Sequence, residues 1–274
     1  MRLLTLLAAL LPLLGSAATG PAEDSPLKAS RWSSLTFQQQ ALWVTATSEL
    51  QQDACDEKSP GADWCITAVN SVAENRETLR LRVNSRGSLL QRERESVGRK
   101  DRRVKRWSYQ PEAVTRLRLE PGRTEGSDDY IVTSERQLNY PADGSEVTDP
   151  LLLLWLAAQA SSGRLPADPV LVQTDVNFYR VSLTDAGVTT LPIDASIDGE
   201  RVQESREVRR VRIEARAVEP LADKPDFSLL GLSGSITVAV DTADGLPVQL
   251  TGQAPRLGSA EINLIAATRR PSAP

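Results

Sequence analysis

Residues 210–217 read RVRIEARA, and residues 236–250 read ITVAVDTADGLPVQL; of the whole sequence, these two stretches indicate the fold class most directly. In the first, apolar residues such as Val211 and Ile213 alternate with charged ones, which is typical of an antiparallel strand with one face in water. In the second, two alternating runs flank the turn-forming residues 241–245, and this arrangement predicts a β-hairpin. We therefore expect an antiparallel sheet.

Further strands are expected on both sides of these stretches. Alternating or β-compatible runs occupy residues 41–46, 79–83, 114–119, 130–133 and 262–264. The segment 65–73 is ambiguous, because Ile66, Val69 and Val72 recur at helical spacing.

One segment departs from the alternating pattern. Residues 151–160 read LLLLWLAAQA, which predicts a helix. Asp149 is a suitable N-cap, Pro150 fits the first helical position and Gly163 ends the run. The helix is too short to span a bilayer. Because it is apolar nearly all round, we expect a mostly β (α+β) fold with one helix buried near 150–161.

The N-terminal sequence indicates export. Arg2 precedes an apolar run over residues 3–14, and Ser16-Ala17-Ala18 supplies the small residues of a cleavage site. We expect a signal peptide at 1–18, a flexible leader at 19–34, a single β-rich domain at 35–268 and a flexible tail at 269–274. These expectations place the mature protein in the periplasm, without a transmembrane span.

The composition excludes several classes of function. The 274 residues carry a net charge of −4 and no histidine, with 40% hydrophobic and 25% charged residues. A mildly acidic chain does not favour nucleic-acid binding. Without imidazole there is no Ser-His-Asp triad, Cys-His pair or His-ligated zinc. Carboxylate-only chemistry and a Ser-Lys dyad remain open, but no catalytic motif is recognisable, so we expect a non-enzymatic protein with no cofactor and no metal site.

The two cysteines, Cys55 and Cys65, predict a structural disulfide. The residues between them include Pro60 and Gly61, which are typical of a turn. Disulfides form and persist in exported proteins, whereas catalytic dithiols usually sit closer together, as Cys-x-x-Cys. A bridge here would stabilise the fold by about 3 kcal/mol in the chain-entropy account.

The second half of the chain arranges several motifs in a distinctive order. Asp149-Pro150 and the leucine-rich helix are followed by DVNFYRV at 175–181, an arginine-rich strand at 206–218, GLPV at 245–248 and LGSAE at 257–261. Over roughly residues 107–268 this order resembles the exported bacterial domain-of-unknown-function family 3108. The resemblance implies a curved antiparallel sheet or half-barrel, similar to lipoprotein carriers, with a helix across its concave side. It supplies no catalytic residues.

Two groups of residues are candidate binding sites. Leu152, Trp155 and Leu156 on the helix, with Trp43, are expected to line a hollow for a lipid or amphiphile; simple core packing is the alternative. The basic run at 99–107 is a candidate for binding anionic envelope components, and the alternative is a solvated hairpin. Its candidate residues are Arg99, Lys100, Arg102, Arg103, Lys105, Arg106 and Trp107.

The sequence favours a periplasmic, envelope-associated protein that binds a lipidic or amphiphilic ligand. Two other classes stay open. A carboxylate-dependent hydrolase of cell-wall glycan would need two carboxylates facing one another across a cleft. The adjacent Asp128 and Asp129 would face opposite sides of a strand, so we interpret them as turn residues. An interaction protein would recruit an envelope protein by strand addition at a sheet edge.

Overall fold

The structure is a computed structural model that describes residues 26–41, 44–56, 61–99, 101–122, 130–142, 144, 146–255 and 257–270. Its helices are α1 (Pro26–Ala29), η1 (Pro150–Leu152), α2 (Leu153–Ala158) and η2 (Gln159–Ser162). Its strands are β1 (Trp32–Ala41), β2 (Val44–Ala54), β3 (Trp64–Val72), β4 (Asn75–Val83), β5 (Leu89–Val97), β6 (Arg102–Tyr109), β7 (Ala113–Pro121), β8 (Tyr130–Asn139), β9 (Val170–Gln173), β10 (Phe178–Ile197), β11 (Glu200–Ala217), β12 (Ser233–Asp241), β13 (Pro247–Ala254) and β14 (Gly258–Arg269).

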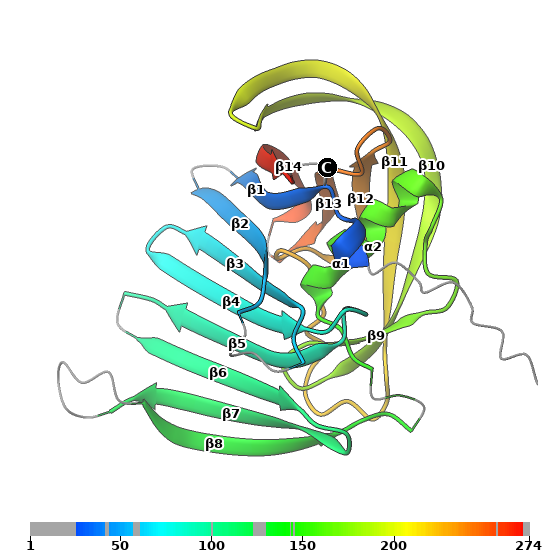
Figure 1. Cartoon of the computed structure of the whole chain (residues 1–274). Coiled ribbons are helices and arrows are strands. Elements are labelled where there is room, and N and C mark those ends of the chain that lie inside the picture. The colour runs from blue at the N-terminus through cyan, green and yellow to red at the C-terminus, as the bar shows by residue number, and fades with distance from the viewer. Residues whose placement is uncertain are drawn as a thin grey trace, which may run out of the picture.

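The described strands form one 14-stranded sheet in the order β8-β7-β6-β5-β4-β3-β2-β1-β14-β13-β12-β11-β10-β9. Neighbouring strands in this order run antiparallel, and the first strand, β1, pairs with the last, β14, in the interior of the sheet. The sheet curves around α2, which lies on its concave side (Figure 1). The mostly β fold, the curved antiparallel sheet and the single buried helix near 150–161 are thus confirmed.

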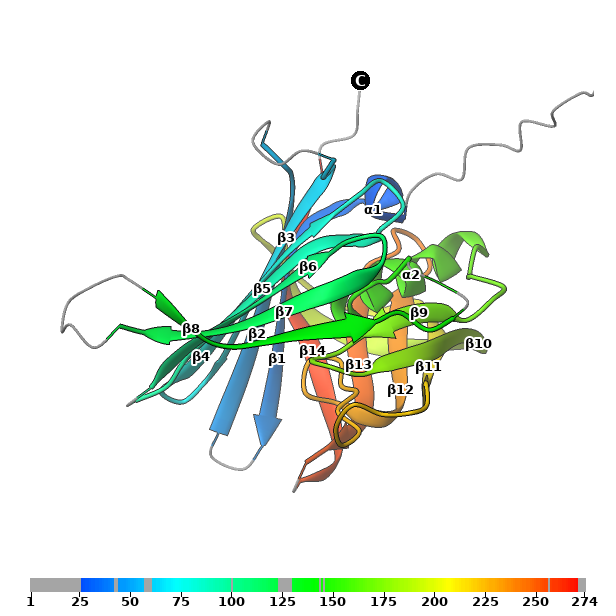
Figure 2. The same ribbon diagram turned by 90° about the horizontal axis from the view of Figure 1, so that it is seen from below.

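The two stretches that indicated the fold class behave as predicted. Val211 and Ile213 on β11 are buried, whereas their neighbours Arg212 and Glu214 are exposed. Strands β12 and β13 form the predicted hairpin, in which Val238 lies opposite Leu250. Seen from below, β1–β8 form one side of the curved sheet and β9–β14 form the other side (Figure 2).

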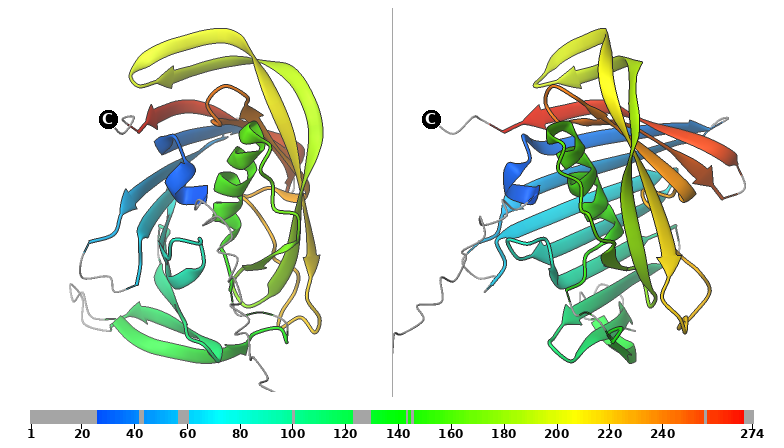
Figure 3. Two further views of the ribbon diagram at one scale, coloured as in Figure 1. Left: turned by 45° about the vertical axis from the view of Figure 1, so that its right-hand side comes forward. Right: turned by 90° about the vertical axis from the view of Figure 1, so that its right-hand side faces the viewer.

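The long hairpin of β10 and β11 folds back onto β14. It arches over β14 (Figure 3), and Ser196 and Ile197 at the end of β10 pair in parallel with Ala266 and Ala267 of β14. Strands β10 to β14 therefore form a closed ring, and β8 and β9 are the two outermost strands of the sheet.

The predicted helix is present as a continuous helical segment from Pro150 to Ser162. The Asp149 side chain caps it by accepting a hydrogen bond of 2.8 Å from the backbone N–H of Leu151. Gly163 adopts the left-handed conformation at φ 71° and ends the segment. In the part of the chain that the structure describes, no helix combines the length and hydropathy needed to cross a bilayer.

The structured chain begins earlier than predicted. Residues 26–34, assigned to a flexible leader, instead form α1 and the start of β1, and both Leu27 and Trp32 are only 1% exposed. These side chains are apolar and find partners on α2, so this segment belongs to the core. At the other end, Arg269 closes β14 rather than starting a tail. Residues 1–25, which include the expected signal peptide, and residues 271–274 lie outside the described residues.

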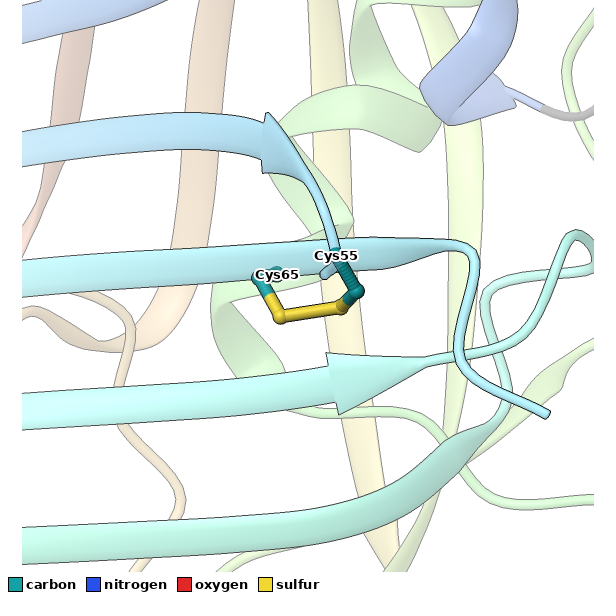
Figure 4. The surroundings of a disulfide bond; sticks show 2 residues. All are labelled: Cys55 and Cys65. Atoms are coloured by element: carbon teal, nitrogen blue, oxygen red, sulfur yellow. A yellow bond between two sulfur atoms is a disulfide. The ribbon is translucent and has the colours of Figure 1, made fainter. Parts of the chain in front are cut away.

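The ambiguous segment 65–73 lies within β3 and the turn that follows it, so the helical spacing was misleading. Ile66 points into the core between Gln52 of β2 and Leu81 of β4, and this pairing overrides the local pattern. The predicted disulfide is present: Cys55, just after β2, is bonded to Cys65 on β3, with their Cα atoms 5.0 Å apart (Figure 4).

Candidate binding site

A cavity of about 540 Å³ lies where α2 faces α1, the β4–β5 loop and β9. Its volume falls within the range of small-molecule sites. The apolar part of its wall includes Leu27, Val147, Leu152, Trp155, Leu156 and Leu171. Three of the four predicted ligand-binding residues therefore line one cavity; the fourth, Trp43, lies outside the described residues.

The helix positions these three side chains on one face, because Leu152, Trp155 and Leu156 are spaced three and four residues apart. Leu152 and Trp155 are almost fully buried, whereas Leu156 is half-buried. The Trp155 indole packs against Trp32 with ring centroids 4.5 Å apart. Trp155 is thus held in place as part of the cavity wall, and Leu156 is the most exposed of the three side chains.

The rim of the cavity is polar. Arg86 and Glu146 form an ion pair of 2.8 Å at the entrance, with both side chains largely in water, and Arg180 of β10 lines the same opening. Thr148 ties the rim to the β4–β5 loop by donating a hydrogen bond of 3.1 Å to the Gly87 carbonyl. An apolar wall with charged groups at its edge suits a molecule that has an apolar body and a polar end.

The cavity lacks the geometry that the hydrolase alternative requires. Among its described lining residues, Glu146 is the single carboxylate, and it is paired with Arg86. Glycoside hydrolysis needs two facing carboxyl groups. Asp128 and Asp129, the adjacent acids considered above, lie outside the described residues.

The basic run forms a strand rather than a solvated hairpin loop. Its residues 102–107 belong to β6, whose alternation sends its side chains to both faces of the sheet. The exposed cations have carboxylate partners: Arg102 contacts Glu95, Arg106 contacts Glu93, Arg99 lies near Glu74 and Arg103 contacts Asp101. Lys100 lies outside the described residues. These pairings reduce the free positive charge that the run was expected to present.

Trp107 was predicted at the surface, and this prediction is wrong. The residue is 0% exposed, and its indole N–H donates a hydrogen bond of 2.8 Å to the Asp175 carbonyl. The guanidinium of Arg92 stacks over its ring at 4.6 Å. Trp107 points to the concave side of β6, where it is covered by the segment between β9 and β10, so it cannot sit at a membrane interface.

Sequence reasoning missed a buried ion pair under the helix start. Arg92 of β5 and Asp149 approach to 3.2 Å, and the two side chains are 6% and 2% exposed. Arg92 also donates to the backbone carbonyls of Gln173 and Thr174, at 3.2 and 2.5 Å. Burial raises the pKa of Asp149, and the charge of Arg92 only partly opposes this. The pair ties β5 to both α2 and β9.

Asp175 is a second anchor that the sequence did not reveal. Arg116 of β7 holds its carboxylate through two contacts of 2.6 and 3.2 Å, Lys105 of β6 contacts the same group, and Arg94 of β5 lies 3.5 Å away. Burial alone would raise the pKa of Asp175, but the hydrogen bonds from Arg116 and Lys105 outweigh it and lower the pKa to about 2. The carboxylate therefore stays ionised at neutral pH and fastens the start of β10 to β5–β7.

No family model matches the chain, and no curated protein matches it in sequence. The resemblance to domain-of-unknown-function family 3108 stays a prediction. The assignment of the cavity as a candidate binding site depends on its geometry.

Proposed function

We propose that this protein binds a lipidic or amphiphilic molecule in the cavity beside α2, as a non-enzymatic component of the periplasm associated with the cell envelope. The observation that supports the proposal is the joint position of Leu152, Trp155 and Leu156 on one wall of a cavity of ligand size. The apolar part of the ligand would lie against this wall. Its polar end would meet Arg86 and Arg180 at the rim.

The energetics favour a ligand that uses both parts of the cavity. An acyl chain that buries about ten methylene groups in an apolar site gains about 8 kcal/mol of binding free energy. Association costs about 4–15 kcal/mol in lost freedom. Burial alone therefore leaves little net affinity, and polar contacts at the rim would decide whether the ligand is retained.

The test is native mass spectrometry of the mature protein purified from a periplasm, followed by organic extraction and lipid analysis. We expect an amphiphile in fixed proportion to the protein. Leu156→Trp would occupy part of the cavity beside the apolar wall and reduce retention. Leu165→Trp is the matched control, because Leu165 is also half-buried but does not line the cavity. A wild-type protein that carries no ligand and does not take up added lauric acid would contradict the proposal.

One observation favours the interaction-protein alternative. Strand β8 is a terminal strand of the sheet, and it exposes Ile131 and Val132 at 51% and 54%. An edge with exposed β-branched residues suits strand addition. Copurification of one stoichiometric envelope protein with the wild type, and its loss in Ile131→Lys, would support this second candidate.

A further inference from the structure

The concave face of the sheet is divided into an apolar half and a basic half. The strand register places Leu50, Ala68 and Leu79 of β2–β4 in one row, which continues across β5 and β6 as Arg94 and Lys105. The neighbouring row runs from Ile66 and Leu81 to Arg92, Trp107 and Arg116. The aliphatic side chains of β2–β4 thus give way to cations on β5–β7.

A second cavity, of about 710 Å³, lies along this face, between the ends of strands β1–β6 and the residues 228–231 that precede β12. We call it the basic trough. It shares no lining residue with the cavity beside α2. Arg94 and Lys105 line it together with Glu77 and the hydrogen-bonding side chains of Ser48, Asn70 and Ser96. The aliphatic side chains of Val72, Val97 and Leu230 also line it, so the trough offers both polar and apolar contacts.

Three cations, two of which line the trough, surround one carboxylate. Arg94, Lys105 and Arg116 all contact the single carboxylate of Asp175. The carboxylate of Glu77 lies 3.8 Å from Arg94, and the carboxylate of Asp226 accepts a hydrogen bond of 3.1 Å from the backbone N–H of Asp175. Arg94 and Lys105 are only 24% and 21% exposed, so water screens their mutual repulsion incompletely.

The titration of Lys105 reflects this crowding. Burial lowers the pKa of Lys105, and the charges of Arg94 and Arg116 lower it further, while Asp175 opposes the shift. An additional anion beside Lys105 would relieve the repulsion among the three cations. The electrostatics of the trough therefore favour an anionic ligand.

We propose that Arg94 and Lys105 form a binding site for a phosphate group in the basic trough. A guanidinium presents a planar fork that matches phosphate oxygens, and an ammonium adds a compact positive charge. Asn70 and Ser96 stand within the same trough as polar partners. The buried Oδ1 atom of Asn70 accepts no hydrogen bond from the described residues, so its amide is able to reorient toward a ligand without losing a bond at that oxygen.

Asp175 competes with phosphate for this site, because its carboxylate already contacts both Arg94 and Lys105. Replacing it with the neutral Asn should therefore strengthen phosphate binding. Replacing Arg94 should weaken it. These opposite directions separate a phosphate site from a general loss of folded protein, which would weaken binding in both variants.

The test is calorimetric titration of the mature, disulfide-bonded protein with inorganic phosphate, glycerol phosphate and dihexanoyl phosphatidylglycerol. We expect saturable binding that Arg94→Gln weakens about tenfold or more, as loss of a charged hydrogen bond predicts. Arg106→Gln is the matched control: Arg106 is one residue from Lys105 on β6 but points to the opposite face, where it pairs with Glu93. We expect this variant to bind like the wild type, and Asp175→Asn to bind more tightly.

Binding of inorganic phosphate would identify a free phosphate site, and binding of the lipid alone would identify a headgroup site; both support the proposal. Absence of saturable binding with all three probes would overturn it. So would equal weakening in Arg94→Gln and Arg106→Gln, since that result would reflect the overall charge. Because the trough and the cavity beside α2 are separate, Leu156→Trp should leave phosphate binding unchanged.

Discussion

Trp155 on α2 donates its indole N–H to the side-chain oxygen of Gln52 on β2, at 2.7 Å, across the concave side of the sheet. Gln52 is 1% exposed and uses its amide nitrogen as well, donating at 3.0 Å to the backbone carbonyl of Leu27 in α1. One buried amide thus joins a strand to both helices that border the cavity. The position of the cavity wall depends on this polar contact as well as on apolar packing.

We expect Gln52→Leu to lower the free energy of unfolding by about 2–4 kcal/mol, because it leaves two buried polar groups, on Trp155 and Leu27, without partners. Urea denaturation measures the change. Gln51→Leu is the control, since Gln51 is exposed on the opposite face of β2, and it should change stability by less than about 0.5 kcal/mol. Equal effects of the two substitutions would show that the buried amide contributes nothing specific.

The sequence was sufficient to predict a strand or a helix end where the local pattern and the tertiary environment agree. The alternation around Val211 and Ile213 marks a strand because one face of β11 is in water. Asp149 and Gly163 mark the helix ends because capping depends on neighbouring residues only. Ile66 shows the opposite case: its spacing resembled a helix, and only its pairing with two adjacent strands fixes it in β3.

The basic trough and the ion pairs could not be predicted in the same way. Arg94 and Lys105 lie in runs in which both faces carry charge, so alternation does not show which side chains point inward. Asp175 is 59 residues from Arg116 and 70 from Lys105 in the sequence. Only the register of β5, β6 and β7 brings them together. For the same reason, the closure of β10 on β14 leaves no local pattern.

The contribution of Asp175 to stability should decrease in acid. Its folded-state pKa of about 2 lies below the ordinary aspartate value of about 3.9. The stabilisation is therefore complete above about pH 5 and is lost as the pH falls toward 2. We expect it to be worth about 1–2 kcal/mol, reduced by the partial exposure of the carboxylate.

The measurement compares the free energy of unfolding of the wild type and Asp175→Asn between pH 2 and 7. The difference between them should shrink as the pH falls through this window. Asp194→Asn serves as the control, because Asp194 pairs with Arg201 in an exposed position, where ion pairs contribute little. A difference between wild type and Asp175→Asn that stays constant with pH would rule out this role for the carboxylate.

Reduction of the Cys55–Cys65 bond should lower the free energy of unfolding by about 3 kcal/mol, mainly because the denatured chain gains freedom. Urea denaturation with and without dithiothreitol measures this change. The double variant Cys55→Ala/Cys65→Ala should match the reduced protein and should not respond to the reductant. If thiol titration shows two free thiols and the unfolding midpoint does not move, the bond is dispensable for stability.

The buried pair of Arg92 and Asp149 offers the strongest single-residue effect. Asp149→Asn keeps an oxygen that can cap Leu151 but removes the negative charge, so Arg92 is left buried without its counter-ion. We expect a loss of about 3–5 kcal/mol. Asp149→Ala should cost about 1 kcal/mol more, because the helix cap is lost as well.

A double-mutant cycle separates the charge pair from the cap. Arg92→Met removes the buried cation, so Asp149→Asn in that background should be much less destabilising than in the wild type. The cap is still needed when the cation is absent, and Asp149→Ala should therefore remain the more destabilising of the two substitutions in the Arg92→Met background. Additive losses in Arg92→Met/Asp149→Asn, measured by urea denaturation, would show that the two charges contribute independently rather than as a pair.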